Sequence, residues 1–347
     1  MNPALAAGLR EILNEAAAGD GATLGAHLGL PGLFSALGWD DPRSPDELLW
    51  ARLEYEAQLE CARAASTALR DAGIAHCAYK GAGLHWLYAP QSRASADVDL
   101  LVDGDRLPDA LVALGQCDAH VVPGAWEAAP PAMRRSVELE WKGGVPVAID
   151  LAWALVDVNR LLSDAGYAHL DRLWSSVREQ DGLAIPDTGQ HWGLVVHHLL
   201  HHDLLHAPGL VDAAVLWSTM DDTAMQAAAD TAQWLGVARV AEGLVGAFAR
   251  RWGSLGPVWP GRRLGLRLDL ATLLRAAGRG SGAAITVRRA WSRARLIDRR
   301  RDAWRLVRDV LAPPSAHLSW RWPEARGYAS RWVRHAARTL RKLIIDP

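Results

Sequence analysis

Ser95-Ala96-Asp97-Val98-Asp99-Leu100-Leu101-Val102 is the stretch that decides the fold. Asp97 and Asp99 stand two positions apart in an apolar run, and the side chains of a strand alternate between its two faces. We therefore expect both carboxylates on one face of a buried strand. Two adjacent anions repel each other and lose hydration there, so a cation is needed beside them, and hard oxygen ligands suit Mg²⁺.

A third carboxylate, Asp150, occurs later in a second apolar run, residues 147–152. Residues 134–141 alternate apolar and polar side chains, and Gly143-Gly144 predicts a hairpin between these two segments. We expect the hairpin to place Asp150 on a strand next to the one that carries Asp99. The sequence thus predicts a three-carboxylate site on a small mixed sheet that begins with a βαβ unit.

A glycine turn lies directly before the acidic strand. Residues 74–79 are expected to form the first strand, and Lys80-Gly81-Ala82-Gly83 then enters a helix. Glycine lets the backbone approach a ligand closely, and the amides at a helix start favour a phosphate. We expect this turn to hold a triphosphate, with Lys80 and Arg93 as the neutralising side chains. A plain tight turn and a surface arginine are the alternative interpretations.

Together these motifs resemble the nucleotidyltransferase superfamily, which has the DNA polymerase β-like fold. More narrowly, the chain is similar to a largely uncharacterised bacterial branch in which Lys-Gly-Ala replaces the usual Gly-Ser. The similarity is strongest over about residues 73–155 and weaker through the helical remainder, where His201 and Asp212 match. Superfamily members use the serine to contact a phosphate, so Ala82 is a departure.

The resemblance implies roles for individual residues. Asp97, Asp99 and Asp150 would be both the catalytic residues and the metal ligands. The nucleotide would be bound by Lys80, Gly81, Ala82, Gly83, Arg93 and Ser95. The implied cofactor is Mg²⁺ or Mn²⁺, and the implied co-substrate is an NTP, with ATP expected.

The resemblance also implies the reaction, which is transfer of an NMP from an NTP to a hydroxyl or similar acceptor, with release of pyrophosphate. The acceptor would be a small molecule, a peptide or a protein. Members of the branch occur beside genes for peptide natural products, which makes a modified peptide one candidate. Two alternatives stay open: a nucleotide-binding regulatory or antitoxin-like module without turnover, and an enzyme that extends RNA 3′ ends.

The expected fold class is α+β, in three parts. Residues 1–72 form an N-terminal helical segment, residues 73–155 the nucleotidyltransferase core, and residues 156–347 a helical domain whose last third is rich in arginine. A helix over 191–206 holds six histidines, several at i, i+4 spacing that could chelate a metal, although packing beside the nucleotide site or hydrogen bonds to the sheet are the favoured interpretations. A linker at 278–282 and basic helices near 284–311 and 325–344 follow.

Composition sets the remaining expectations, since 50% apolar and 22% charged residues are typical of a globular protein. Most of the 38 basic residues lie in 239–347 and most of the 39 acidic ones lie before it. Such a basic block either binds phosphate or nucleic acid or packs on the acidic half, and we favour the second. No apolar run approaches the roughly 18 residues of a membrane span, and Glu11 and Glu15 are untypical of a signal peptide. We therefore expect a cytoplasmic protein with no membrane partner, and three unclustered cysteines agree with a reducing compartment.

Overall fold

The computed structural model describes most of the chain. The described residues are 1–28, 30, 33–88, 93, 95–128, 135–155, 170–202, 204–260, 265–278 and 315–345, with the single residues 296, 303, 304, 308 and 313. Three predicted segments fall largely outside them: the start of the helical domain at 156–169, the linker after Gly278, and the basic helix near 284–311 apart from four single residues.

A mixed sheet carries the acidic motif. Its strands are β1 (His76–Ala78), β2 (Val98–Val102), β3 (Ala119–Val121), β4 (Ser136–Trp141) and β5 (Val147–Ala152), in the spatial order β1-β2-β5-β4-β3. β2 and β5 run parallel, and the other neighbouring pairs are antiparallel. The sheet confirms the α+β class and the predicted hairpin between β4 and β5.

The predicted βαβ unit is wrong, because β1 and β2 are antiparallel and pair His76 with Val102 and Ala78 with Leu100. Parallel neighbours need a crossover that runs back along the sheet, usually as an α-helix. Among the described residues of the connection, the helical part is the 3-10 helix η2 (Gly81–Leu87), which has seven residues. β2 therefore begins at the same edge of the sheet at which β1 ends.

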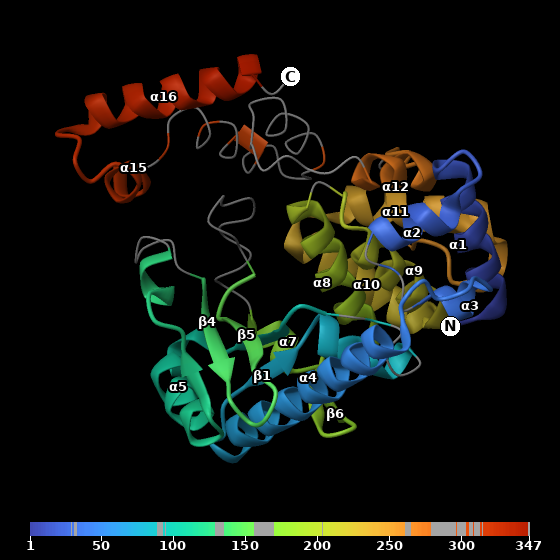
Figure 1. Ribbon diagram of the computed structural model, residues 1–347, viewed down its shortest axis with the longest axis horizontal. Helices are drawn as coiled ribbons and strands as arrows, with labels where there is room; N and C mark the ends of the chain where they lie inside the picture. Colours follow the sequence, from blue (N-terminus) through green and yellow to red (C-terminus); the bar gives the residue numbers. More distant parts are fainter. Residues whose placement is uncertain are drawn as a thin grey trace.

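The two faces of the sheet pack against different helices. Val98, Leu100 and Val102 share a hydrophobic core with the helices α4 (Pro45–Asp71) and α5 (Leu107–Gln116), whereas Leu101 belongs to a second core with the C-terminal helices. The long helix α4 runs along the sheet (Figure 1), and a capping box between Ser44 and Glu47 starts it. Asp99 lies between Val98 and Leu100 in β2, and successive side chains of a strand point to opposite faces, so Asp99 lies on the face away from α4.

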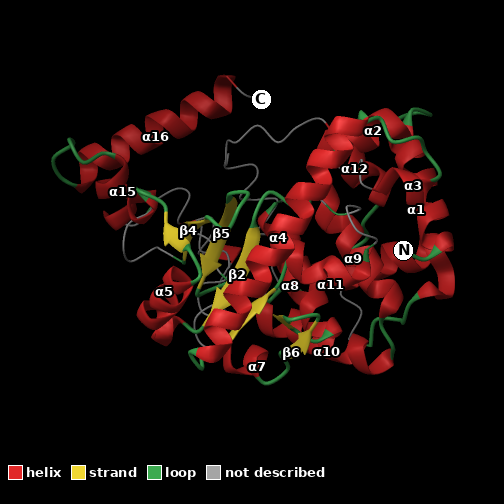
Figure 2. Ribbon diagram, turned by 60° about the horizontal axis from the view of Figure 1, so that its bottom comes forward, coloured by secondary structure: helices red, strands yellow, loops and turns green. Residues whose placement is uncertain are grey.

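Helices that precede the sheet in the chain and helices that follow it gather beside it (Figures 1 and 2). They are α1 (Pro3–Ala16), α2 (Gly21–His27), α3 (Phe34–Leu37), α7 (Leu170–Trp174), α8 (Thr188–His201), α9 (Ala207–Thr219), α10 (Asp222–Leu235), α11 (Ala238–Trp252) and α12 (Leu270–Gly278). α1 contacts α9, α11 and α12, so the N-terminal segment and the later helices share one core.

Short 3-10 helices and two C-terminal helices complete the described elements. They are η3 (Gly104–Arg106), η4 (Ala125–Ala128), η6 (Gly253–Leu255), α15 (Ser315–Arg321) and α16 (Tyr328–Ile345). α15 and α16 pack against each other. Among the described helices, none combines the length and the apolar character needed to cross a membrane.

Two expectations about the helical part are corrected. A hairpin of β6 (Arg178–Gln180) and β7 (Leu183–Ile185) interrupts it and packs on β1 and α4, and its Asp181-Gly182 turn is a hairpin signal readable in the sequence. The helix predicted over 191–206 ends at His201. Pro208 fits only the first turn of a helix, so a second helix, α9, begins there with His206 as its N-cap.

Candidate active site

Asp99 and Asp150 are direct neighbours across the parallel strands β2 and β5. Their Cα atoms are register partners, and both residues alternate with side chains that pack toward α4, so they share the opposite face. Asp97 comes one residue before β2, and its charge acts on both of the other carboxylates. The structure therefore brings the three predicted carboxylates to one place.

The environment of Asp99 and Asp150 favours the neutral forms of these two carboxyl groups. Burial raises the pKa of Asp99 to about 6, and the charges of Asp97 and Asp150 act in the same direction, while Lys80 opposes them. Burial also raises the pKa of Asp150, against the effects of Lys80 and of a hydrogen bond from Ser136. A cation at this face would offset the cost of holding the carboxylates ionised.

Lys80 provides one such cation. Its Nζ forms an ion pair with Asp99 Oδ1, and the two side chains are only 18% and 6% exposed. Burial acts to lower the pKa of Lys80, but the acidic groups of Tyr79, Asp99 and Asp150 outweigh it and raise that pKa. An ammonium group thus lies against the buried carboxylate that the sequence predicted to need a positive partner.

Carboxylate oxygens are the ligands that Mg²⁺ and Mn²⁺ prefer, and the mutual repulsion of Asp97, Asp99 and Asp150 fits a cation site. In the arrangement described here, with Lys80 paired to Asp99, no three His, Cys, Asp or Glu side chains among the described residues are placed to hold a metal ion. The chemistry of the donor set is suitable for a divalent ion.

A fourth carboxylate was missed. Glu138 on β4 is the register partner of Asp150, so Asp99, Asp150 and Glu138 form a row across three adjacent strands. Glu138 is exposed, and its charge helps to raise the pKa of Asp150. The sequence contained the signal, because a β4–β5 hairpin centred on Gly144 places position 138 opposite position 150.

The glycine turn packs against the loop that leads into β2. Gly81 has φ 38°, and a Cβ there would lie 2.5 Å from Ser95 Oγ. Ser95 Oγ donates to the carbonyl of Asp97 at 2.9 Å, and Gln58 of α4 donates to the carbonyl of Ser95 at 2.6 Å. These contacts fix the turn relative to the acidic strand, while its role as a phosphate cradle stays a prediction.

The close packing of the turn predicts that Gly83→Ala is destabilising. A Cβ at Gly83 would lie 2.5 Å from the carbonyl oxygen of Ala78, a backbone atom that cannot move independently of β1. We expect the free energy of unfolding, measured by urea denaturation, to fall by about 1–3 kcal/mol.

Gly115→Ala is the matched control for this substitution. Gly115 lies within α5, where an added Cβ would be 3.9 Å from its nearest neighbour. Alanine favours a helix over glycine, so this variant should gain about 0.5–1 kcal/mol. Equal stability of the Gly83→Ala protein and the wild type would show that the turn is looser than described.

Arg93 lies in a second buried cluster, with Asp212 of α9. Its Nε and Nη2 donate to the Asp212 carboxylate at 3.0 and 2.9 Å, and the hydroxyl of Tyr88 donates to the same carboxylate at 2.7 Å. Burial opposes the charge of Arg93, but Asp212 outweighs it and raises the pKa of Arg93. The sequence predicted that Arg93 contacts the phosphates of the nucleotide. In the structure, the Asp212 carboxylate holds the Arg93 guanidinium in place.

The helical part also contacts the glycine turn through α8. His191 is fully buried, and its Nε2 forms a hydrogen bond with the carbonyl of Tyr79 at 2.8 Å. Burial lowers the pKa of His191 to about 4, so the ring is neutral at pH 7 and can donate to that carbonyl. Tyr79 precedes Lys80, so α8 helps to fix the position of the site lysine.

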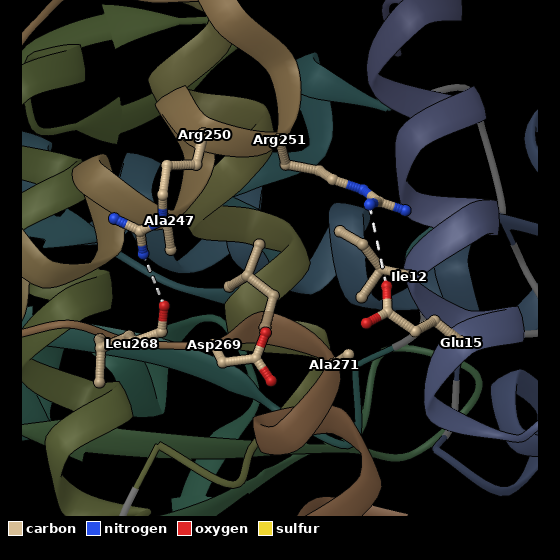
Figure 3. A pocket seen from close by; sticks show the side chains of 9 residues that line it. Ile12, Glu15, Ala247, Arg250, Arg251, Leu268, Asp269 and Ala271 are labelled. Atoms are coloured by element: carbon tan, nitrogen blue, oxygen red, sulfur yellow. Dashed lines mark hydrogen bonds and ion pairs between the residues drawn. The ribbon is translucent and has the colours of Figure 1, made fainter.

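A separate pocket lies between α1, α11 and the start of α12 (Figure 3). Its arginines are engaged, because Arg250 donates to the carbonyl of Leu268 at 2.8 Å and Arg251 pairs with Glu11 at 3.0 Å. The described residues that line it include none of the predicted site residues. We therefore place the candidate site at the carboxylate face of the sheet.

Comparison with known proteins gives the family of the chain. No curated protein was found to be similar to the chain. Residues 46–253 match the model of a family described as uncharacterised nucleotidyltransferase, and this match contains every predicted site residue. It covers more than half of the chain, from the start of α4 to the end of α11. The chain belongs to this uncharacterised nucleotidyltransferase family and is a nucleotidyltransferase.

Proposed function

We propose that the enzyme transfers an NMP from an NTP, with ATP as the expected donor, to a hydroxyl on a small molecule, peptide or protein. The new bond joins the acceptor oxygen to the α-phosphorus, the bond to the β-phosphate breaks, and pyrophosphate leaves. The observation that carries the proposal is the register of β2 and β5, which sets Asp99 beside Asp150 with Lys80 against them.

Asp97, Asp99 and Asp150 are the residues that would hold Mg²⁺ or Mn²⁺. A bound divalent ion would neutralise phosphate charge and lower the pKa of the acceptor hydroxyl. The nearby like charges, which help to raise the pKa values of Asp99 and Asp150 in the free protein, support a cation site at this face.

Lys80 and Arg93 would neutralise the phosphates of the NTP. Both are buried cations, and each is oriented by a carboxylate, Asp99 and Asp212 respectively. Buried charges that are fixed before the reaction stabilise developing charge better than mobile surface groups do. Asp150 would accept the proton of the acceptor hydroxyl, and its raised pKa makes it a better base at neutral pH.

The direct test is a screen of the common NTPs with Mg²⁺ or Mn²⁺ against small hydroxyl compounds, peptides, proteins and an RNA oligonucleotide. Pyrophosphate release and an acceptor mass increase of one NMP are the expected results. Mass increase on the RNA alone would assign the acceptor to nucleic acid. Tight NTP binding without pyrophosphate release from any mixture would contradict the proposal.

A further inference from the structure

Three imidazoles meet where α8 ends and α9 begins. The ring centroids of His198 and His202 are 4.5 Å apart, those of His202 and His206 are 5.0 Å apart, and those of His198 and His206 are 5.3 Å apart. In one continuous helix, His198 and His206 would be separated by about 12 Å along the axis. The cluster therefore exists because the chain breaks after His201 and starts a new helix at Ala207.

This imidazole cluster lies on α8 and α9, the helices that contact Tyr79, directly before Lys80, and Arg93. His191 contacts the carbonyl of Tyr79, directly before Lys80, and His198 lies two helical turns further along the same face of α8. The charge of Lys80 lowers the pKa of both His198 and His206, and the charge of Arg93 also lowers that of His206. The three rings and the two cations thus belong to one neighbourhood.

The rings of His198 and His206 are neutral at pH 7 in the free protein. Burial lowers the pKa of His206 to about 4 and that of His198 well below its ordinary value. Among the described residues, the groups that affect the pKa values of His198 and His206 through their charge include Lys80, Arg93, Asp212 and the titratable rings of His201 and His202. Of these, Asp212 raises the pKa of His206, and the others lower the pKa of the ring on which they act. Repulsion from the nearby positive groups therefore adds to burial.

The tautomer of His206 is fixed by its capping role. The backbone N–H of Gly209 donates to His206 Nδ1 at 3.2 Å, and a backbone amide can only donate. The neutral ring must therefore carry its proton on Nε2. The Nε2–H of His206 remains a hydrogen-bond donor, while its Nδ1 caps the N-terminus of α9.

We propose that His198, His202 and His206 form, with Lys80 and Arg93, the subsite for the terminal phosphates of the NTP. This inference deepens the proposed function and rests on it for the identity of the ligand. Lys80 and Arg93, which Asp99 and Asp212 hold in place, supply positive charge for a polyphosphate. Its oxygens accept hydrogen bonds from imidazole N–H groups, and such a bond strengthens when a ring that does not cap a helix, such as His198, becomes protonated.

The inference predicts that the protein takes up protons when it binds a polyphosphate. The anion offsets the repulsion that helps to keep His198 neutral, so the pKa of His198 rises in the complex, while His206 Nδ1 stays unprotonated and caps α9. The complex then binds more protons than the free protein. The affinity for the polyphosphate, relative to that of a variant without these three rings, should therefore increase as the pH falls from about 8 to about 6.

Calorimetric titration with inorganic triphosphate, at pH 7 in two buffers of different ionisation enthalpy, tests this without turnover. The triple variant His198→Gln, His202→Gln and His206→Asn removes the rings, and asparagine retains a side-chain oxygen to cap α9. We expect the variant to bind about tenfold more weakly or worse and to lose the extra proton uptake. His120→Gln, an exposed histidine on β3, is the control and should match the wild type.

Equal affinity and equal proton uptake in the wild type and the triple variant would overturn the inference. Selective Zn²⁺ binding by the wild type with unchanged triphosphate affinity would also overturn it, by assigning the rings to a metal. His206→Asn alone, with a smaller expected loss, serves if the triple variant does not fold. If no NTP is turned over but triphosphate binding still depends on the rings, the proposed function fails and this inference stands. Turnover with an unchanged KM for NTP in the triple variant would reject the inference alone.

Discussion

Asp150→Asn is expected to reduce nucleotidyl transfer by about 10²–10⁴-fold while leaving the protein folded. The amide has nearly the shape of the carboxylate but cannot accept the acceptor's proton and is a poor ligand for a divalent ion. Burial already disfavours the charge of Asp150, so its removal should change the free energy of unfolding by less than about 1 kcal/mol. Pyrophosphate release with the best NTP and acceptor measures the first effect, and urea denaturation the second.

Asp99→Asn should abolish transfer as well, but it also leaves the Lys80 ammonium without its carboxylate, so part of its effect is on stability. Asp109→Asn is the matched control, since Asp109 is an exposed carboxylate of α5 that pairs with Arg106. Its activity should equal that of the wild type. Full activity of the Asp150→Asn protein would remove Asp150 from the catalytic set and leave only a nucleotide-binding fold.

Asp212→Ala is expected to lower the free energy of unfolding by about 3–5 kcal/mol. Asp212 and Arg93 are only 4% and 12% exposed, and the same carboxylate also accepts from Tyr88. Removal of the carboxylate leaves a buried guanidinium without its counter-charge, which costs more than the pair contributed. Urea denaturation of the variant, with and without a nucleotide, is the measurement.

Two comparisons isolate the buried pair. The double variant Asp212→Ala with Arg93→Met removes both charges and should recover much of the lost stability, which gives a coupling energy for the pair. The surface pair of Arg106 and Asp109, with 43% and 61% of the side chains exposed, should lose less than about 0.5 kcal/mol on Asp109→Ala. Equal losses at Asp212 and Asp109 would mean that Arg93 is solvated in the folded protein.

The strands and helices with local signals were predictable. The hairpin β4–β5 follows from alternation and Gly143-Gly144, and α4 from its capping box and length, because these patterns act between residues close in the chain. The antiparallel pairing of β1 with β2 was missed, because neither strand encodes its direction relative to the other. The β6–β7 hairpin was missed although its Asp-Gly turn was visible.

The candidate site also combines residues that the sequence predicted with contacts that only the structure shows. Asp97, Asp99 and Asp150 were predicted as site residues from two acidic segments of sequence, and Glu138 could have been added to this prediction by counting the hairpin register. The partners of the basic residues were beyond reach. The pairing of Arg93 with Asp212 and the contact of His191 with Tyr79 join positions more than a hundred residues apart.

By itself, the sequence determined which side chains share a strand face, because the two-residue alternation of a strand is a local property of the backbone. It therefore determined the family and the carboxylate face of the sheet. Only the tertiary structure decided which cation lies on which carboxylate and which histidines meet. Such contacts depend on how α8 and α9 pack beside the sheet, and packing selects partners by shape and burial over the whole chain, which no short stretch of sequence specifies.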